Sequence, residues 1–267
     1  MKLTRILSGL IGLPLVALIL ILGNIYVIDV FFTLIAIISI HEYMNSFKDK
    51  SNPVKWIGYL SCILIAFLHV IPSTYYLLAL SLFITCLVAI LFIHVVITNM
   101  KTSIKDIMVT FFGIIYIVFF LSFIPMLHGL ENGKFLIWYI LIAAWGTDTF
   151  AYFVGSAIGK HKFSKISPKK SIEGCVGGTV GAVLITLIYT YLINRFGGLN
   201  VSYLLITPII FVLSILSQIG DLSASSIKRT VEIKDFGNLI PGHGGMLDRI
   251  DSIIFIAPFA YFLLTLV

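Results

Sequence analysis

The stretch Thr74–Ile97, TYYLLALSLFITCLVAILFIHVVI, contains no Asp, Glu, Lys or Arg. An α-helix of about 20 such residues crosses the roughly 30 Å hydrocarbon layer of a membrane. Strands of a membrane barrel alternate in polarity and this run does not, so it predicts a transmembrane helix. The whole chain is similar, since 59% of its 267 residues are hydrophobic and 11% are charged, against about 45–50% and about 25% in soluble domains. We therefore expect an all-α, polytopic integral membrane helical bundle.

Nine apolar runs predict about nine transmembrane helices. They cover residues 6–23, 25–45, 54–72, 74–97, 106–127, 135–158, 174–194, 202–220 and 252–267. We expect one integrated bundle, in which residues 1–130 have short polar connections and residues 131–267 carry the chemistry. Polar residues suited to chemistry gather in two segments of the second part, 143–178 and 221–252.

Positive charge predicts the orientation of the helices. When the 18 Lys and Arg are assigned to the ends of these runs, only Lys134 and Arg195 fall on one side. The positive-inside rule then places the N-terminus and the even-numbered loops in the cytoplasm. The formal charge of +6 is explained by loops near anionic headgroups, so we expect membrane lipids and no nucleic acid as partners.

The first polar segment combines a carboxylate within an apolar run and a cluster of lysines. Asp148 costs several kcal/mol in a membrane unless it faces a polar cavity or a partner, and Tyr152 projects from the same helix face. The following cations are Lys160, Lys162, Lys165, Lys169 and Lys170. With Ser171 before a glycine-rich helix start, they suit phosphate oxygens. The alternatives are a structural hydrogen bond for Asp148 and a topology signal for the lysines.

The second polar segment, DLSASSIKRTVEIKDFGNLIPGHGGMLDRIDS at Asp221–Ser252, holds nine of the 30 charged residues. If the preceding helix continues past Gly220, one of its faces carries Asp221, Ser225, Lys228 and Arg229. Lys234 and Asp235 follow, and PGHGG predicts a sharp turn around His243, where Gly244 and Gly245 let a ligand approach the main chain. Asp248, Arg249 and Asp251 then precede the last run.

Two acids in this segment suggest a metal site. Asp221 closes one apolar run and Asp248 precedes another, and carboxylates from two helices together with substrate phosphates suit Mg²⁺. Asp251 has the simpler alternative of a solvated helix start. His41, His69, His94 and His128 stand in no setting comparable to that of His243.

The stretch Ser225–Asp251 resembles the signature of bacterial and organellar phosphatidate cytidylyltransferases, also called CDP-diacylglycerol synthases. The shared pattern is S-x-apolar-K-R, four residues, K-D, and then H-G-G-apolar-x-D-R-apolar-D. DTFAYFVGSAIGKHKFSKISPKKSIEG is similar to the second characteristic stretch of that family, with Ser171 in place of the usual threonine. The hydroxyl is kept by this replacement.

The resemblance implies that CMP is transferred from CTP to phosphatidate, giving CDP-diacylglycerol and pyrophosphate in phospholipid biosynthesis. It also implies Mg²⁺, with a monovalent cation such as K⁺, and a homodimer. The implied metal ligands are Asp221 and Asp248, and the implied catalytic residues are these two with Lys228, Arg229 and His243. The expected substrate-binding residues are Asp148, Tyr152, Lys169, Lys170, Ser171, Ser225, Lys234, Asp235, Gly244, Gly245, Arg249 and Asp251. The expected location is a prokaryotic inner membrane, with the active site facing the cytoplasm.

Other functions fit the sequence less well. A related CTP-dependent enzyme acting on an isoprenoid lipid, or phosphorylating a lipid alcohol, is the nearest alternative. CDP-alcohol phosphotransferases carry a DGxxAR, eight-residue, GxxxDxxxD pattern that the sequence lacks. A secondary transporter predicts acids near the membrane midplane and two related halves, whereas most acids here lie at predicted cytoplasmic edges.

Overall fold

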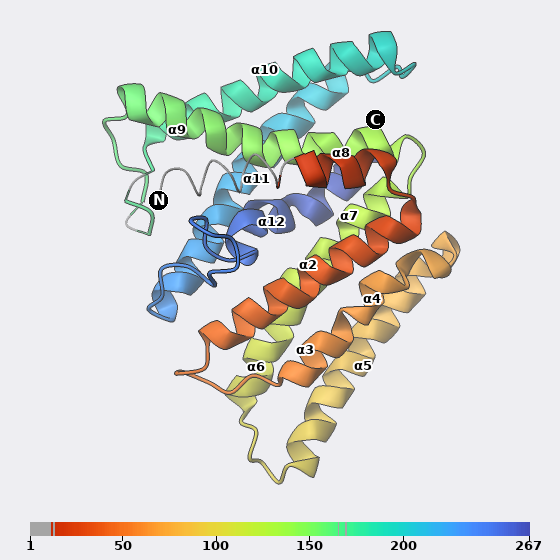
Figure 1. The fold of residues 1–267 in the computed structure, drawn as a ribbon, viewed down its shortest axis with the longest axis vertical. Helices are drawn as coiled ribbons and strands as arrows, with labels where there is room; N and C mark the ends of the chain where they lie inside the picture. Colours follow the sequence, from red (N-terminus) through yellow and green to blue (C-terminus); the bar gives the residue numbers. More distant parts are fainter. Residues whose placement is uncertain (1–11, 13, 165, 169) are drawn as a thin grey trace. The chain divides into compact units, whose positions relative to one another are not determined.

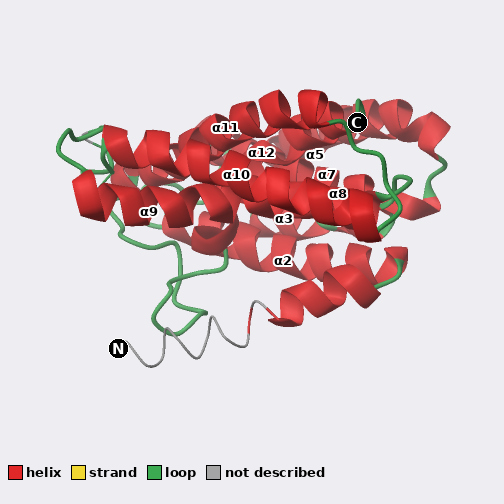
Figure 2. Cartoon of the chain, turned by 90° about the horizontal axis from the view of Figure 1, so that it is seen from above, coloured by secondary structure: helices red, strands yellow, loops and turns green. Residues whose placement is uncertain are grey.

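The structure is a computed structural model of one chain and describes residues 12, 14–164, 166–168 and 170–267. The described residues form helices and loops without a β-strand (Figure 2), which confirms the predicted all-α class. They cluster into two compact units. The first contains the chain up to Gly129 together with Val231–Arg249, and the second contains Leu130–Thr230 with Ile250–Val267.

The first unit is built around α2, Ile25–Ser46. Residues 14–22 are also helical. The unit further contains α3 Lys55–Ser61, α4 Ile63–Ala66, the short turns η1 Leu68–Val70 and η2 Ser73–Tyr75, α5 Tyr76–Ile97, α6 Ile104–Gly113, the π-helical η3 Ile114–Phe119, and α7 Phe120–His128. Asn24 starts α2 by accepting a 2.9 Å hydrogen bond from the Val27 amide, as an N-cap does. α2 packs against α3, α4, α6 and α7 (Figure 1).

Glycines let large side chains fill the core of the first unit. Tyr43 and Met44 of α2 are almost fully buried. Gly113 of α6 lies against the Tyr43 ring, and Gly58 of α3 lies against the Met44 thioether. A β-carbon at either glycine would overlap these side chains, so the sequence of α2 and the small residues of its neighbours specify one close packing.

The second unit contains the two longest of the described helices, α10 and α11. Its helices are α8 Gly133–Leu141, the π-helical η4 Ile142–Gly146, α9 Thr147–Ile158, α10 Ile172–Phe196, α11 Tyr203–Thr230, and the part of α12, Leu247–Leu264, that follows Arg249. α9 and α10 run side by side (Figure 1). Gly178 of α10 makes their close approach possible, because a β-carbon there would lie 2.7 Å from the Thr147 carbonyl oxygen.

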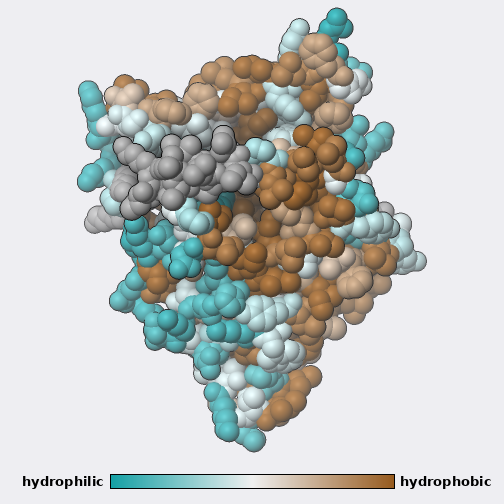
Figure 3. All heavy atoms as spheres, viewed as in Figure 1, coloured by the Kyte–Doolittle hydropathy of each residue, from teal (hydrophilic) through white to brown (hydrophobic). Residues whose placement is uncertain are grey.

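Within the part of the chain that the structure describes, six helices are long and apolar enough to cross a membrane. They are Ile25–Ser46, Leu78–Ile97, Ile104–His128, Gly133–Ile158, Ile172–Phe196 and Tyr203–Thr230. The chain is therefore an integral membrane protein. In Figure 3 the helices of the first unit present mostly hydrophobic atoms, while the α5–α6 connection is hydrophilic.

Two predicted runs differ from the structure. Residues 54–72 are not one helix but the separate pieces α3, α4 and η1, and the apolar stretch Lys55–Ala66 is too short to be one of the candidate membrane spans. The last helix begins at Leu247 instead of residue 252, so Asp248 and Asp251 lie within it. The first run, 6–23, falls partly outside the described residues, and the number nine stays a prediction.

Candidate active site

The α11 helix continues to Thr230 and so confirms the polar helix face that the sequence predicts. Asp221, Ser225 and Lys228 are half-buried along it, whereas Arg229 is exposed. The continuation past Gly220 is stabilised by close packing, since Gly220 lies against Phe255 of α12. Polar side chains are thereby held in order along the last turns of a long apolar helix.

One ion pair joins the two polar segments of the sequence. Lys170 Nζ lies 2.8 Å from Asp221 Oδ2, and these side chains are 12% and 32% exposed. Ser171, the next residue, caps α10 by accepting a 3.1 Å hydrogen bond from the Gly174 amide. The cap fixes the start of α10, and with it the position of the Lys170 ammonium group beside α11.

A cavity of about 320 Å³ surrounds this ion pair. Asp148, Tyr152, Lys170, Ser171 and Asp221 line it, together with Ala151, Gly155, Ser156 and Ser167. The π-helical η4 directly precedes α9, and such segments frequently occur at functional sites. The structure thus brings together five of the predicted site residues within the second unit.

Asp251 lies near a cation and is buried, so the alternative of a solvated helix start is wrong. It is buried in α12, and its Oδ2 lies 4.0 Å from Lys228 Nζ. Its other oxygen accepts a 2.7 Å hydrogen bond from the Ser252 amide. A buried carboxylate requires such partners, so Asp251 holds the Lys228 side chain toward α12.

In the first unit, Asp248 organises the glycine-rich loop. Its Oδ2 accepts hydrogen bonds from the amides of Phe236 at 2.9 Å and Gly245 at 3.0 Å. The turn around His243 has the expected form, since Gly242 and Gly244 have φ of +77° and +87°, which favour glycine. His243 donates its amide to the Ile240 carbonyl at 2.9 Å.

A second predicted group lines a cavity of about 450 Å³ in the first unit. Its lining residues are Lys234, Asp235, Gly237, Asn238, Ile240, Gly242, His243, Gly244 and Arg249. Two cations and a histidine around an open turn suit an anionic ligand. Each unit therefore has one cavity that contains five of the predicted site residues. Neither of these two cavities is lined by the predicted residues Ser225, Lys228, Arg229, Gly245, Asp248 and Asp251. Lys169 lies outside the described residues.

The carboxylates suit a hard cation. Asp221 is part-exposed on a cavity wall, and the carboxylate of Asp248, although it accepts two amides, offers about four acceptor positions. Within the described residues no group of three or more His, Cys, Asp or Glu is arranged to hold a metal ion. Mg²⁺ is usually held by one or two carboxylates with substrate phosphates and water, so the donor chemistry of these two aspartates fits that ion.

Sequence reasoning missed Glu42. This buried carboxylate of α2 accepts hydrogen bonds from the amides of Met246 at 3.0 Å and Leu247 at 2.9 Å, at the start of α12. Gly237 and Gly245 lie so close to it that a β-carbon at either would overlap its carboxyl group. The sequence signal that could have identified Glu42 is an acidic residue within an apolar run, because an acid inside a membrane needs a partner.

A second buried pair also went unrecognised. His69 Nδ1 lies 2.7 Å from Asp29 Oδ1, and the side chains are 7% and 1% exposed. The pair ties α2 to η1 in the first unit. His69 therefore has a specific buried setting that its sequence neighbours did not reveal.

Comparison with known proteins gives a consistent family. The sequence model described as "Cytidylyltransferase family" matches residues 3–267. A Bacillus subtilis phosphatidate cytidylyltransferase is 43% identical over 51% of this chain. The Thermotoga maritima protein of the same name is 40% identical over 56% of this chain, and that of Haemophilus influenzae is 42% identical over 51%.

These matches are partial in the relatives as well. They cover 49% of the Bacillus subtilis protein, 56% of the Thermotoga maritima protein and 48% of the Haemophilus influenzae protein. This chain thus spans about half the length of the curated relatives it matches.

Proposed function

We propose, since this chain belongs to the cytidylyltransferase family, that it transfers CMP from CTP to phosphatidate. The products are CDP-diacylglycerol and pyrophosphate. The relatives at about 40% identity carry the name phosphatidate cytidylyltransferase, and the close agreement of Ser225–Asp251 with that family's signature supports the same substrates here.

The observation that carries the proposal is the 2.8 Å contact between Lys170 and Asp221. It joins two polar segments that are far apart in sequence, at the wall of a cavity that also contains Asp148 and Ser171. An ammonium group, a hydroxyl and carboxylates in one partly enclosed space are the groups that position and neutralise transferring phosphates.

The reaction needs no strong general base. The second pKa of a phosphate monoester is about 6, so the phosphatidate phosphate is largely dianionic near neutral pH. One of its oxygens attacks the α-phosphorus of CTP in line, and the bond from that phosphorus to the bridging oxygen of the β-phosphate breaks. The electron pair leaves with pyrophosphate. Lys170, Lys228, Arg229 and Arg249 are the cations that we propose to balance the charge.

Asp221 and Asp248 would hold Mg²⁺, and His243 would contact a phosphate or shape its turn. When bound, the metal ion supplies neutralisation of phosphate charge. Asp251 keeps Lys228 in place, and Asp148 orients groups within the cavity around Lys170. Lys234, Asp235, Gly244 and Gly245 would contact substrate from the loop, and Ser225 from α11.

We further propose that the protein acts as a homodimer in a prokaryotic inner membrane, with these groups facing the cytoplasm. The predicted excess of Lys and Arg on one side of the membrane supports this orientation. A site at that boundary receives the nucleotide from water and the lipid from the bilayer.

The test is a transfer assay with purified protein in detergent micelles that contain phosphatidate, labelled CTP and Mg²⁺. Wild type should incorporate label into lipid and release pyrophosphate in equal amounts. Asp221→Asn should lose both products, whereas Asp49→Asn, which alters an exposed acid of the α2–α3 connection, should retain them. A folded wild-type protein that labels no phosphatidate but labels an isoprenoid phosphate would replace this proposal by the nearest alternative.

A further inference from the structure

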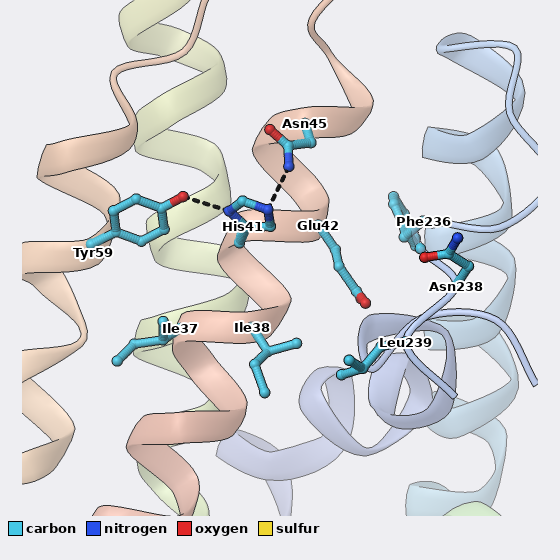
Figure 4. Close-up of a pocket in the computed structure, with 10 residues that line it drawn as sticks. Ile37, Ile38, His41, Glu42, Asn45, Tyr59, Phe236, Asn238 and Leu239 are labelled. Atoms are coloured by element: carbon cyan, nitrogen blue, oxygen red, sulfur yellow. Dashed lines mark hydrogen bonds between the residues drawn. The ribbon is translucent and has the colours of Figure 1, made fainter. Parts of the chain in front are cut away.

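A third cavity, of about 590 Å³, lies within the first unit and has no role in the transfer as proposed so far. Figure 4 shows α2 along its floor, Tyr59 of α3 on one side, and Asn238 and Leu239 on the other. Its walls are mostly apolar, with Ile37, Ile38, Phe236 and Leu239, and its polar residues are His41, Glu42, Asn45, Tyr59 and Asn238. A volume of several hundred Å³ suits part of a small molecule.

A chain of hydrogen bonds fixes the protons in this cavity. Lys55 Nζ lies 2.6 Å from Asn45 Oδ1, and because an ammonium group only donates, that amide oxygen accepts. The Asn45 NH₂ group therefore faces His41 Nε2, at 2.7 Å, and donates to it. The ring of His41 then carries its proton on Nδ1, which lies 2.6 Å from the Tyr59 hydroxyl oxygen and donates to it.

The consequence is that Tyr59 presents a hydrogen-bond donor to the cavity. Its oxygen is already an acceptor from His41, and its own proton has no acceptor among the side chains and backbone of the described residues. Tyr59 is half-buried, and its hydroxyl proton is available to a ligand that supplies an oxygen acceptor. Figure 4 shows the two dashed bonds that orient this group.

The lining of the cavity does not favour a phosphate as that acceptor. Neither Lys nor Arg occurs among the described residues that line it. Its one carboxylate, Glu42, points toward the loop in Figure 4 and is engaged with the amides of Met246 and Leu247. The ligand group that fits Tyr59 is therefore an uncharged acceptor. Membrane lipids provide such an acceptor in their ester carbonyl groups.

The polarity along α2 also suits a lipid. Leu34, Ile38, His41 and Asn45 follow one another at helical spacing on one face, so the face changes from apolar to polar along its length. Leu34 is 55% exposed, and the chain after α2 carries Lys48 and Lys50. Acyl chains, ester groups and a charged headgroup follow in the same order across one leaflet of a bilayer.

Two of the lining residues belong to another cavity as well. Gly237 and Asn238 line both this space and the basic cavity that contains Lys234, His243 and Arg249. We propose that the cavity beside α2 holds the glycerol–ester region of phosphatidate, with the Tyr59 hydroxyl donating to an ester carbonyl next to the basic cavity. This inference rests on the proposed function, and it makes Tyr59 a residue that selects ester-linked lipid.

The experiment compares diester phosphatidate with its diether analogue, which lacks both carbonyl groups. In detergent micelles with either lipid as the only one present, Tyr59→Phe should raise the KM for the diester about fivefold, the equivalent of one hydrogen bond of about 1 kcal/mol. The KM for the diether and for CTP should equal those of wild type. Tyr26→Phe, which alters an exposed tyrosine of α2 outside the cavity, should change none of these values.

Several results would overturn the assignment. Equal increases of KM for diester and diether would mean that Tyr59 only supports the structure, and no increase would mean that it contacts no carbonyl. An effect that requires added ester-linked bulk phospholipid would identify a bilayer lipid as the occupant instead of the substrate.

Failure of the proposed function would look different. Wild type would then turn over neither lipid, and equilibrium binding would replace KM as the readout. Under the cavity inference, wild type binds the diester more tightly than the diether and Tyr59→Phe removes that difference. Equal binding of both lipids by wild type would contradict it.

Discussion

Leu247 donates its backbone amide to Glu42 at 2.9 Å, although 205 residues separate them. Met246 donates to the other oxygen of the same carboxylate. A carboxylate at a helix N-terminus satisfies amides that have no partner within the helix and complements the helix dipole. Glu42 thus holds the beginning of α12, the turn that carries Asp248, from a helix near the other end of the chain.

Removing this carboxylate should loosen that turn. Glu42→Ala leaves two buried amides without acceptors, at a cost of about 1–3 kcal/mol each, and should lower the thermal unfolding midpoint and the affinity for Mg²⁺ together. Glu42→Gln, which keeps one acceptor oxygen, should lose less of both. Thermal unfolding in detergent and a Mg²⁺ titration provide the measurements, and unchanged Mg²⁺ affinity in Glu42→Ala would separate this turn from the metal.

Lys170 should matter for transfer more than its neighbouring lysines do. Lys170→Met removes the ammonium group beside Asp221 and should lower kcat by roughly 10²-fold, as loss of one charge-stabilising group does. Lys160→Met changes an exposed lysine that precedes the same connection and serves as the control. Equal activities of the two variants in the CMP transfer assay would remove Lys170 from the proposed site.

The Asp29–His69 pair should be structural. Asp29→Ala leaves His69 buried without its carboxylate, and removal of one member of a buried pair costs about 3–5 kcal/mol. We expect a lower unfolding midpoint, with kcat of the folded protein within about twofold of wild type, because neither residue lines the cavities around Lys170 or His243. A large fall in kcat at a temperature where the variant is folded would argue against this view.

Close packing of α9 and α10 should tolerate no side chain at Gly178. Gly178→Val places atoms against the Thr147 carbonyl and should destabilise the protein by about 1–3 kcal/mol, as overpacking does. Gly146→Ala is the matched control, since the nearest atom to its β-carbon would be an ordinary 3.7 Å away. Unfolding midpoints of both variants give the comparison, which fails if Gly178→Val is as stable as Gly146→Ala.

An exposed ion pair predicts a small dependence on pH. The hydrogen bond and charge of Lys50 lower the pKa of Glu232 below its usual value. A lowered carboxyl pKa contributes stability above the unfolded value of about 4.3, and this contribution disappears as the pH falls through the folded value. The stability difference between wild type and Glu232→Gln should therefore vanish in acid and in high salt; a difference that persists in acid would indicate another cause.

The sequence predicts most of the helices because hydropathy is a local property. The run Thr74–Ile97 and the helix α5 coincide closely, and α11 extends past Gly220 as expected. Residues 54–72 failed as one helix because hydropathy does not report where a backbone changes direction. Pro72 and the turns near it lie at the end of that broken stretch.

The sequence predicts some residues of the candidate site and misses others. Lys170, Ser171 and Asp221 meet as expected because the family resemblance identifies both polar segments. The sequence did not predict roles for Glu42 and Tyr59, because each is a single polar residue in an apolar stretch. Their roles depend on hydrogen-bond partners that are distant in the sequence. Burial and hydrogen bonding, which assign their roles, exist only after folding.

The π-helical segment Ile142–Gly146 makes the position of Asp148 depend on the number of residues that precede it. A regular α-helix turns by about 100° per residue, and a π-helical turn accommodates one residue more than an α-helical one. If the same residues formed a regular α-helix instead, Asp148 would be rotated by about that angle relative to α8. Deletion of one residue from the segment, with a return to regular α-helix, would compensate for that rotation and leave Asp148 facing its cavity.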